Sequence, residues 1–171
     1  YVPRDTLVLI ANDAANFIHF SVANQFGLEI SKVIVEKKEF NLLRNTILDS
    51  VESNTSTGAP KRFAFNEAAE IYNMIFRHKD YDFEETIEEI LEKEKIKNLV
   101  FLPSKSMDYL PLQLLVTGKA EDKNKKTYNW LIDKVQISYY PDFNKKMLTQ
   151  LLSKEFAKTA SRETVSVNSF L

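Results

Sequence analysis

The stretch Asn98-Leu99-Val100-Phe101-Leu102-Pro103 decides the fold that this sequence predicts. It is a compact apolar run without polar alternation, which is typical of a strand buried on both faces in the middle of a parallel sheet. A helical pattern over Glu84–Lys95 precedes it directly, and that order indicates an αβ unit. Because Pro103 cannot donate a sheet hydrogen bond, we expect the strand to end there. The sequence therefore predicts an α/β fold with a parallel sheet flanked by helices.

Toward the amino terminus, residues 1–36 predict an antiparallel meander of three short strands. The apolar run Thr6–Ala11 comes first, and turn residues follow it. Asn16–Ala23 repeats with a period of two, as expected for a strand with one better-buried face. Gly27, which tolerates a positive φ, turns the chain into a third strand over Leu28–Val35.

Residues 40–95 predict helices that connect the meander to the parallel sheet. The first helix has an apolar stripe at spacings of three and four, the second follows Asn66 as its N-cap, and the third is Glu84–Lys95. The first stripe consists of Phe40, Leu43, Ile47 and Val51. Ser53–Lys61, which collects Ser, Thr, Gly and Pro, is expected to be a surface loop.

Residues 98–171 predict the first part of the parallel sheet. After the strand that ends at Pro103 we expect a loop at Ser104–Leu110, a short helix at Leu112–Val116 and a polar loop at Gly118–Thr127. A core segment at Trp130–Ile132 and a strand at Val135–Tyr139 should follow. The last expected elements are a helix carrying Leu148, Leu151 and Leu152 and the start of a strand at Val165–Leu171. Two central parallel strands and a fragment of a third would leave this core open. We therefore expect a segment of a longer polypeptide, and the start at Tyr1, which is not a natural initiator, agrees.

Composition argues against several classes of function. The 171 residues include 23 basic and 24 acidic ones, so the chain has no polycationic surface for nucleic acid. It holds no cysteine, which excludes a disulfide, a thiolate zinc site and a cysteine nucleophile within these residues. It has three glycines, no glycine-rich phosphate loop and no apolar run of about 18 residues. We expect no cofactor and no direct nucleic-acid or membrane partner, and the absence of cysteine favours the reducing cytoplasm.

Histidine placement argues against a catalytic centre made by this chain alone. His19 is expected on the outer face of a hairpin, and His78 at the carboxyl end of the second helix, where a cation meets the negative end of the helix dipole. The spacing His78-x-Asp80-x-Asp82 could gather ligands around a hard cation, but the glycine of a calcium loop is missing. Helix N-capping by Asp80 or Asp82 is the interpretation we prefer. We assign no catalytic residue and no metal ligand.

Two groups of segments, taken in order, resemble a known family. The first group is Asp5–Ile10, Asn16–Val22 and Gly27-Leu28, and the second is Asn98–Pro103, Asp108–Leu115, Trp130–Ile132 and Val135–Pro141. Their order and spacing resemble the N-terminal half of CHAT domains, the caspase-like domains often found after tetratricopeptide helical repeats. The sequence departs from the family at Ser104-Lys105, where many members have Asp-Gly, and at Asp142, where a Ser is frequent.

The resemblance implies a caspase-like three-layer α/β sandwich, here incomplete and preceded by the antiparallel β-meander. On this view residues 1–171 are the N-terminal portion of one CHAT domain. The parent would be a cysteine endopeptidase of clan CD, in which a His acts as general base toward a Cys nucleophile. The family's His and Cys map to no residue here, so we expect no activity from this chain alone.

The resemblance also implies a site and partners. The loop after the strand that ends at Pro103 would form the rim of the substrate cleft, because clefts in open α/β sheets lie at the carboxyl ends of the strands. The rim residues would be Ser104, Lys105, Ser106, Asp108 and Tyr109. The implied partners are the remaining C-terminal half of the same domain and tetratricopeptide-type repeats or an activating protein, in a cytoplasmic and bacterial parent. Two alternatives stay open, namely a catalytically dead scaffold of the same fold and a small protein-interaction domain unrelated to peptidases.

Overall fold

The computed structural model describes residues 2–52, 62–78, 85–107, 110–119 and 128–140. All helices and strands given below belong to the unit Tyr1–Tyr139. The predicted helix around Leu148–Leu152 and the predicted strand at Val165–Leu171 lie outside the described residues, as does the predicted loop at 53–61. None of the described helices is long and apolar enough to cross a lipid bilayer.

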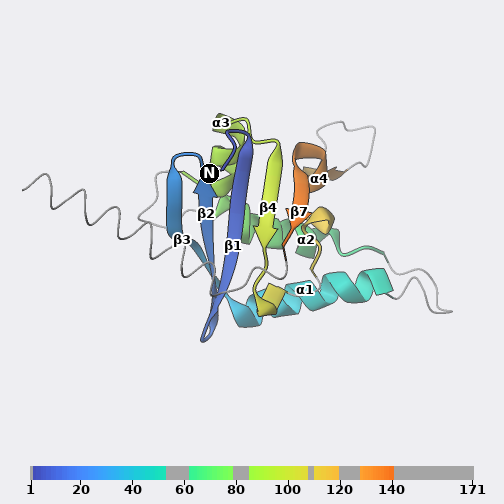
Figure 1. The fold of residues 1–171 in the computed structure, drawn as a ribbon. Helices are drawn as coiled ribbons and strands as arrows, with labels where there is room; N and C mark the ends of the chain where they lie inside the picture. Colours follow the sequence, from blue (N-terminus) through green and yellow to red (C-terminus); the bar gives the residue numbers. More distant parts are fainter. Residues whose placement is uncertain (1, 53–61, 79–84, 108–109, 120–127, 141–171) are drawn as a thin grey trace, which may run out of the picture. The chain divides into compact units, whose positions relative to one another are not determined.

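One mixed five-stranded sheet forms the centre of this unit (Figure 1). Its strands are β1 (Thr6–Ala14), β2 (Phe17–Asn24), β3 (Gly27–Glu36), β4 (Asn98–Leu102) and β7 (Gln136–Tyr139), in the order β3-β2-β1-β4-β7. The first three pair antiparallel, as predicted for the meander, whereas β1 with β4 and β4 with β7 pair parallel. The meander therefore does not precede the parallel sheet as a separate layer, because its first strand is also the parallel neighbour of β4.

The central position predicted for the stretch at 98–103 is confirmed, since β4 lies between two parallel neighbours. Leu99 and Phe101 are fully buried on the face that the helices cover. On the opposite face Leu102 is also buried, while Val100 is only half-buried. The prediction that both faces are buried thus holds fully for the helix side and in part for the other.

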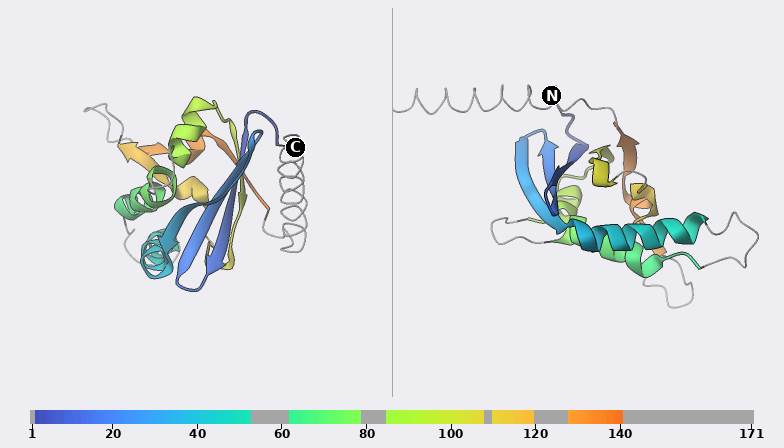
Figure 2. Two further views of the ribbon diagram at one scale, coloured as in Figure 1. Left: turned by 90° about the vertical axis from the view of Figure 1, so that its left-hand side faces the viewer. Right: turned by 90° about the horizontal axis from the view of Figure 1, so that it is seen from below.

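Three of the described helices cover one face of the sheet (Figure 2). They are α1 (Lys37–Glu52), α2 (Phe65–Tyr72), which continues directly into the π-helical turn η1 (Asn73–Arg77), and α3 (Ile87–Lys93). Their buried side chains form one core with the sheet, including Phe40, Leu43, Ile47, Ala68, Ile71, Tyr72, Ile75, Phe76, Ile87, Ile90 and Leu91. Val51 was expected in the same stripe but is 40% exposed, because Ser50, 5% exposed, takes the inward position in the last turn of α1. The last turn of α1 extends beyond the sheet in Figure 1.

A small second sheet and single turns fill the connection between β4 and β7. The connection contains the 3-10 turns η2 (Lys105–Met107) and η3 (Leu112–Leu114), the strands β5 (Val116–Lys119) and β6 (Tyr128–Trp130) and the single helical turn α4 (Leu131–Lys134). The helix predicted at Leu112–Val116 is therefore wrong at its end, because Val116 already pairs with Trp130. Ile132 was expected in the core but is 51% exposed, since α4 is one turn that buries only Leu131.

Two helix starts differ from the predicted ones. Ala64, not Asn66, occupies the N-cap of α2 and makes no side-chain cap, and the adjoining Phe63 and Phe65 rings pack edge to face at a centroid distance of 5.0 Å. Apolar packing rather than a polar cap therefore accompanies this helix start. The third helix begins at Ile87 instead of Glu84, because Thr86 and Glu89 form a capping box ahead of it. Asp80 and Asp82 lie outside the described residues.

Replacing Thr86 by Ala tests this assignment of the start of α3. The variant loses the bond from the Glu89 amide to the Thr86 hydroxyl, and we expect the free energy of unfolding to fall by about 1 kcal/mol in urea denaturation. Thr46→Ala is the matched control. The Thr46 hydroxyl only bonds back to the Leu42 carbonyl within α1, so a loss above about 0.5 kcal/mol there, or none at Thr86, would contradict the assignment.

Candidate functional site

The loop after β4 is held at the carboxyl ends of the parallel strands. We call residues 103–107 and 110–115 the post-β4 loop. Ser104, 8% exposed, follows Pro103 directly, and its carbonyl accepts a bond from the Met107 amide at 3.0 Å, which closes the turn η2. Because β1 and β4 run parallel, this turn lies beside the end of β1.

Asp13, near the end of β1, binds the turn through both carboxylate oxygens. Its Oδ1 accepts a bond from the Ser104 hydroxyl at 3.2 Å, and its Oδ2 accepts one from the Ser106 amide at 3.1 Å. The Lys37 ammonium, at the start of α1, lies 3.6 Å from Oδ1. Both side chains of this ion pair are less than a quarter exposed. The arrangement joins β1, α1 and the post-β4 loop at one point.

The pKa of Asp13 lies below its ordinary value. Partial burial by itself raises the pKa, since it disfavours the charged carboxylate. The bonds from Ser106 and Ser104 and the charge of Lys37 act in the opposite direction and together outweigh that effect. Asp13 is therefore a charged acceptor at neutral pH, and the Ser104 hydroxyl is its donor.

Two further side chains hold the post-β4 loop. The Arg44 guanidinium of α1 donates to the Ser106 carbonyl, so both backbone groups of Ser106 are bonded. Tyr139, at the end of β7, accepts from the Leu112 amide and donates to the Gln113 side chain at 2.6 Å. The loop is thus bonded to the carboxyl ends of β1 and β7 and to α1.

The predicted rim residues are brought together in part. Ser104 and Ser106 meet at Asp13, whereas Lys105 between them is exposed. Asp108 and Tyr109 lie outside the described residues. His19 is on the face of the sheet opposite to Ile18, as predicted, and His78 follows η1 directly.

Sequence reasoning missed Asp13, Lys37 and Arg44. The sequence predicts a turn directly after Ala11, at Asn12 and Asp13, but β1 continues to Ala14. A carboxylate at the carboxyl end of a parallel strand would have been the signal, but nothing in a single sequence shows that β1 pairs parallel with β4. Arg44 lies outside the apolar stripe predicted for the first helix, and nothing in the sequence pattern singles it out. Among the described residues no group of three potential metal ligands occurs.

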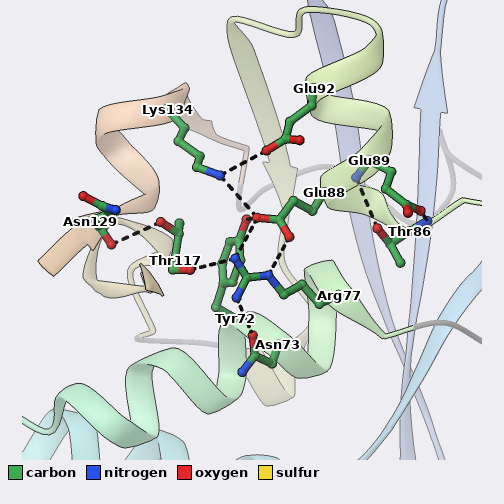
Figure 3. Close-up of polar contacts among 10 residues, drawn as sticks. All are labelled: Tyr72, Asn73, Arg77, Thr86, Glu88, Glu89, Glu92, Thr117, Asn129 and Lys134. Carbon is green, nitrogen blue, oxygen red and sulfur yellow. Dashed lines mark hydrogen bonds and ion pairs between the residues drawn. The ribbon is translucent and has the colours of Figure 1, made fainter. Parts of the chain in front are cut away.

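A second polar cluster surrounds Glu88 of α3 (Figure 3). Its carboxylate accepts from the Tyr72 hydroxyl at 3.0 Å, from two nitrogens of Arg77 and from the Lys134 ammonium at 3.2 Å. Arg77 also donates to the Thr117 carbonyl of β5 at 2.8 Å. Burial raises the pKa of Glu88, but the bonds from its three partners lower it further than burial raises it. The cluster joins η1, α3, α4 and the small sheet.

These geometries position loops and do not by themselves perform a covalent reaction. The Ser104 hydroxyl donates to Asp13, and the lowered pKa of this carboxylate makes it a weak base for taking the proton of a nucleophilic serine. What the Asp13 cluster provides is a rigid, partly charged rim at the end of the sheet. Comparisons with known protein families, with curated proteins and with solved structures found no match to this chain.

A carboxyl-carbon NMR titration tests the Asp13 geometry. We expect Asp13 to titrate below its ordinary value of 3.8. A carboxylate with a depressed pKa contributes stability above its unfolded-state pKa, and this contribution is lost as the pH falls through the folded-state pKa. Asp13→Asn should therefore be less stable than the parent at about pH 7, with the difference shrinking below about pH 4. An Asp13 pKa at or above the ordinary value would contradict the contacts described.

A double-mutant cycle tests the Glu88 cluster. Arg77→Gln and Glu88→Gln, alone and together, should show a coupling energy of about 0.5–1 kcal/mol, a range that allows for the 43% exposure of Arg77. The more exposed pair Lys93 and Glu85 is the control and should couple less. Equal coupling in the two pairs would show that the Glu88 cluster is an ordinary surface ion pair.

Proposed function

We propose that this chain is the N-terminal part of a caspase-like cysteine peptidase domain of the CHAT type, and that the post-β4 loop forms one wall of its substrate cleft. The observation that carries the proposal is the attachment of this loop to the carboxyl ends of β1 and β7 through Asp13 and Tyr139. In open α/β sheets, ligands bind in the crevice outside the carboxyl ends of the parallel strands.

The role of this chain in the proposed reaction is to keep the post-β4 loop rigid as one wall of the substrate cleft. The sequence contains no cysteine, so the nucleophile comes from outside these residues. The family resemblance implies the same for its general base. Asp13 and Arg44 bond both backbone groups of Ser106 and so fix the turn. Lys105 is the exposed side chain of the turn and can reach a bound peptide, whereas Ser106 is half-buried and Met107 is buried. A preorganised wall of this kind lowers the cost of orienting the substrate.

The free edge of β7 is the place for the rest of the domain. Among the described residues β7 pairs with β4 alone, and its exposed Gln136 and Ser138 alternate with half-buried Ile137 and Tyr139. A further parallel strand from the C-terminal half of the domain would continue the sheet there. The proposed activation by helical repeats and the cytoplasmic, bacterial setting rest on the family resemblance.

A specific observation favours the alternative of a non-catalytic interaction domain. Phe17 and Ile34 are 45% and 39% exposed, and the register of β2 and β3 places them as diagonal neighbours on one face. Exposed apolar side chains that gather on a sheet mark protein contacts more often than single ones do. The same β2–β3 surface would serve a scaffold that has the peptidase fold without its chemistry.

The natural protein that contains these residues tests the proposal. We expect a panel of biotinylated peptide acyloxymethyl ketones to label one cysteine outside this stretch, identified by mass spectrometry. Lys105→Glu should change the labelling rate of charged relative to neutral probes by about threefold to tenfold, as expected for a charge at the rim of a cleft. Lys38→Glu, which changes another exposed lysine at the start of α1, should leave that ratio unchanged.

Labelling of no cysteine across the panel would overturn the peptidase proposal and favour the interaction domain. Labelling with the same probe preference in Lys105→Glu and in Lys38→Glu would show that the post-β4 loop does not line the cleft.

A further inference from the structure

A pocket of about 500 Å³ lies between the second half of α1, the segment entering α2 and Tyr128 of β6. Its volume falls within the range of small-molecule sites. None of the lining residues belongs to the post-β4 loop, so the pocket is separate from the proposed cleft wall. Nothing in the proposed function uses it.

Aromatic rings build one wall of this pocket. Phe65 and Tyr128 stack with their ring centroids 3.8 Å apart and their planes 9° from parallel, and Phe63 meets Phe65 edge to face. Trp130, which does not line the pocket, packs behind them at 5.5 Å from Phe63 and 5.9 Å from Phe65. Because each ring is held by another, the wall is an apolar surface formed before any ligand arrives.

Charges of both signs line the same pocket. Asp49 of α1, Arg62 ahead of α2 and Glu67 in its first turn all face it. Within the described part of the chain none of the three takes part in an ion pair. A guanidinium and two carboxylates around one hollow are complementary to a ligand that carries both charges, whereas a simple cation would meet Arg62 and a simple anion would meet the carboxylates.

We propose that this pocket binds a small apolar zwitterion, that is, an α-amino acid or dipeptide with free termini. Arg62 takes the ligand carboxylate, Asp49 and Glu67 take the ammonium group, and the apolar side chain lies against Phe63, Phe65 and Tyr128. Guanidinium–carboxylate bonds are among the strongest polar contacts in proteins, and the aromatic wall supplies the apolar part of the binding energy.

The single tryptophan of the chain provides the readout. Leucyl-phenylalanine is added to the full 171-residue chain, and Trp130 fluorescence is followed because this ring contacts two rings of the wall. We expect a saturable change. The matched control ligand is N-acetyl-leucyl-phenylalanine amide, which has the same side chains and no charges and should bind at least about tenfold more weakly.

Variants then assign the charges. Arg62→Gln and Asp49→Asn should each weaken binding by about threefold to tenfold, while Lys38→Gln, an exposed charge at the opposite end of α1, should not change it. Lys105→Glu in the post-β4 loop should also leave dipeptide binding unchanged, so failure of this proposal and failure of the peptidase proposal are distinguishable. Far-UV circular dichroism checks that each variant is folded.

The proposal is overturned by any of three results. The first is the absence of a saturable response up to about 10 mM dipeptide, which corresponds to a negligible affinity. The second is equal binding of the blocked and the free dipeptide. The third is unchanged binding in both Arg62→Gln and Asp49→Asn.

Discussion

The parallel pairing of β1 with β4 is the constraint on which the rest of the structure depends. Its register runs from Thr6 opposite Asn98 to Ile10 opposite Leu102. Bringing β1 and β4 together closes the long chain segment between them, at an entropic cost that grows only slowly with the length of that segment. Burial of the apolar faces of the two strands offsets this cost. Once the pair has formed, the end of β1 lies beside the start of the post-β4 loop, and Asp13 can reach Ser104 across 91 positions of sequence.

Apolar burial stabilises the unit, and the polar clusters set positions within it. Each fully buried Leu, Ile or Phe of the core contributes about 1.5–3 kcal/mol, and the sheet and its helices share many of them. The ion pairs of Asp13 and Glu88 are partly exposed and contribute less. Their effect is geometric, because Asp13 holds the post-β4 loop to the sheet and Glu88 holds the small sheet and α4 to the helices. The polar contacts therefore determine where the post-β4 loop and the small sheet lie, and apolar burial determines how stable the unit is.

Sequence patterns predicted the elements better than their neighbours in space. A period of two located β2, spacings of three and four located the buried face of α1, and an uninterrupted apolar run located β4. These patterns report which face of an element is buried, and they do not report which strand lies beside it. The sequence therefore could not predict that β1 is a parallel partner of β4, and without that pairing it could not predict the role of Asp13. The strands β5 and β6 were missed because Gly118 and polar residues interrupt any alternation.

Engineered cross-linking tests the pairing of β1 with β4 most directly, because the chain has no cysteine of its own. Val8 and Val100 are register partners, so the double variant Val8→Cys, Val100→Cys should form an intramolecular disulfide under mild oxidation. Ser138 pairs with Val100 from the other side and lies two strand spacings, about 10 Å, from Val8. The variant Val8→Cys, Ser138→Cys should stay reduced. Cross-linking of the second variant, or failure of the first in folded protein, would contradict the central pairing.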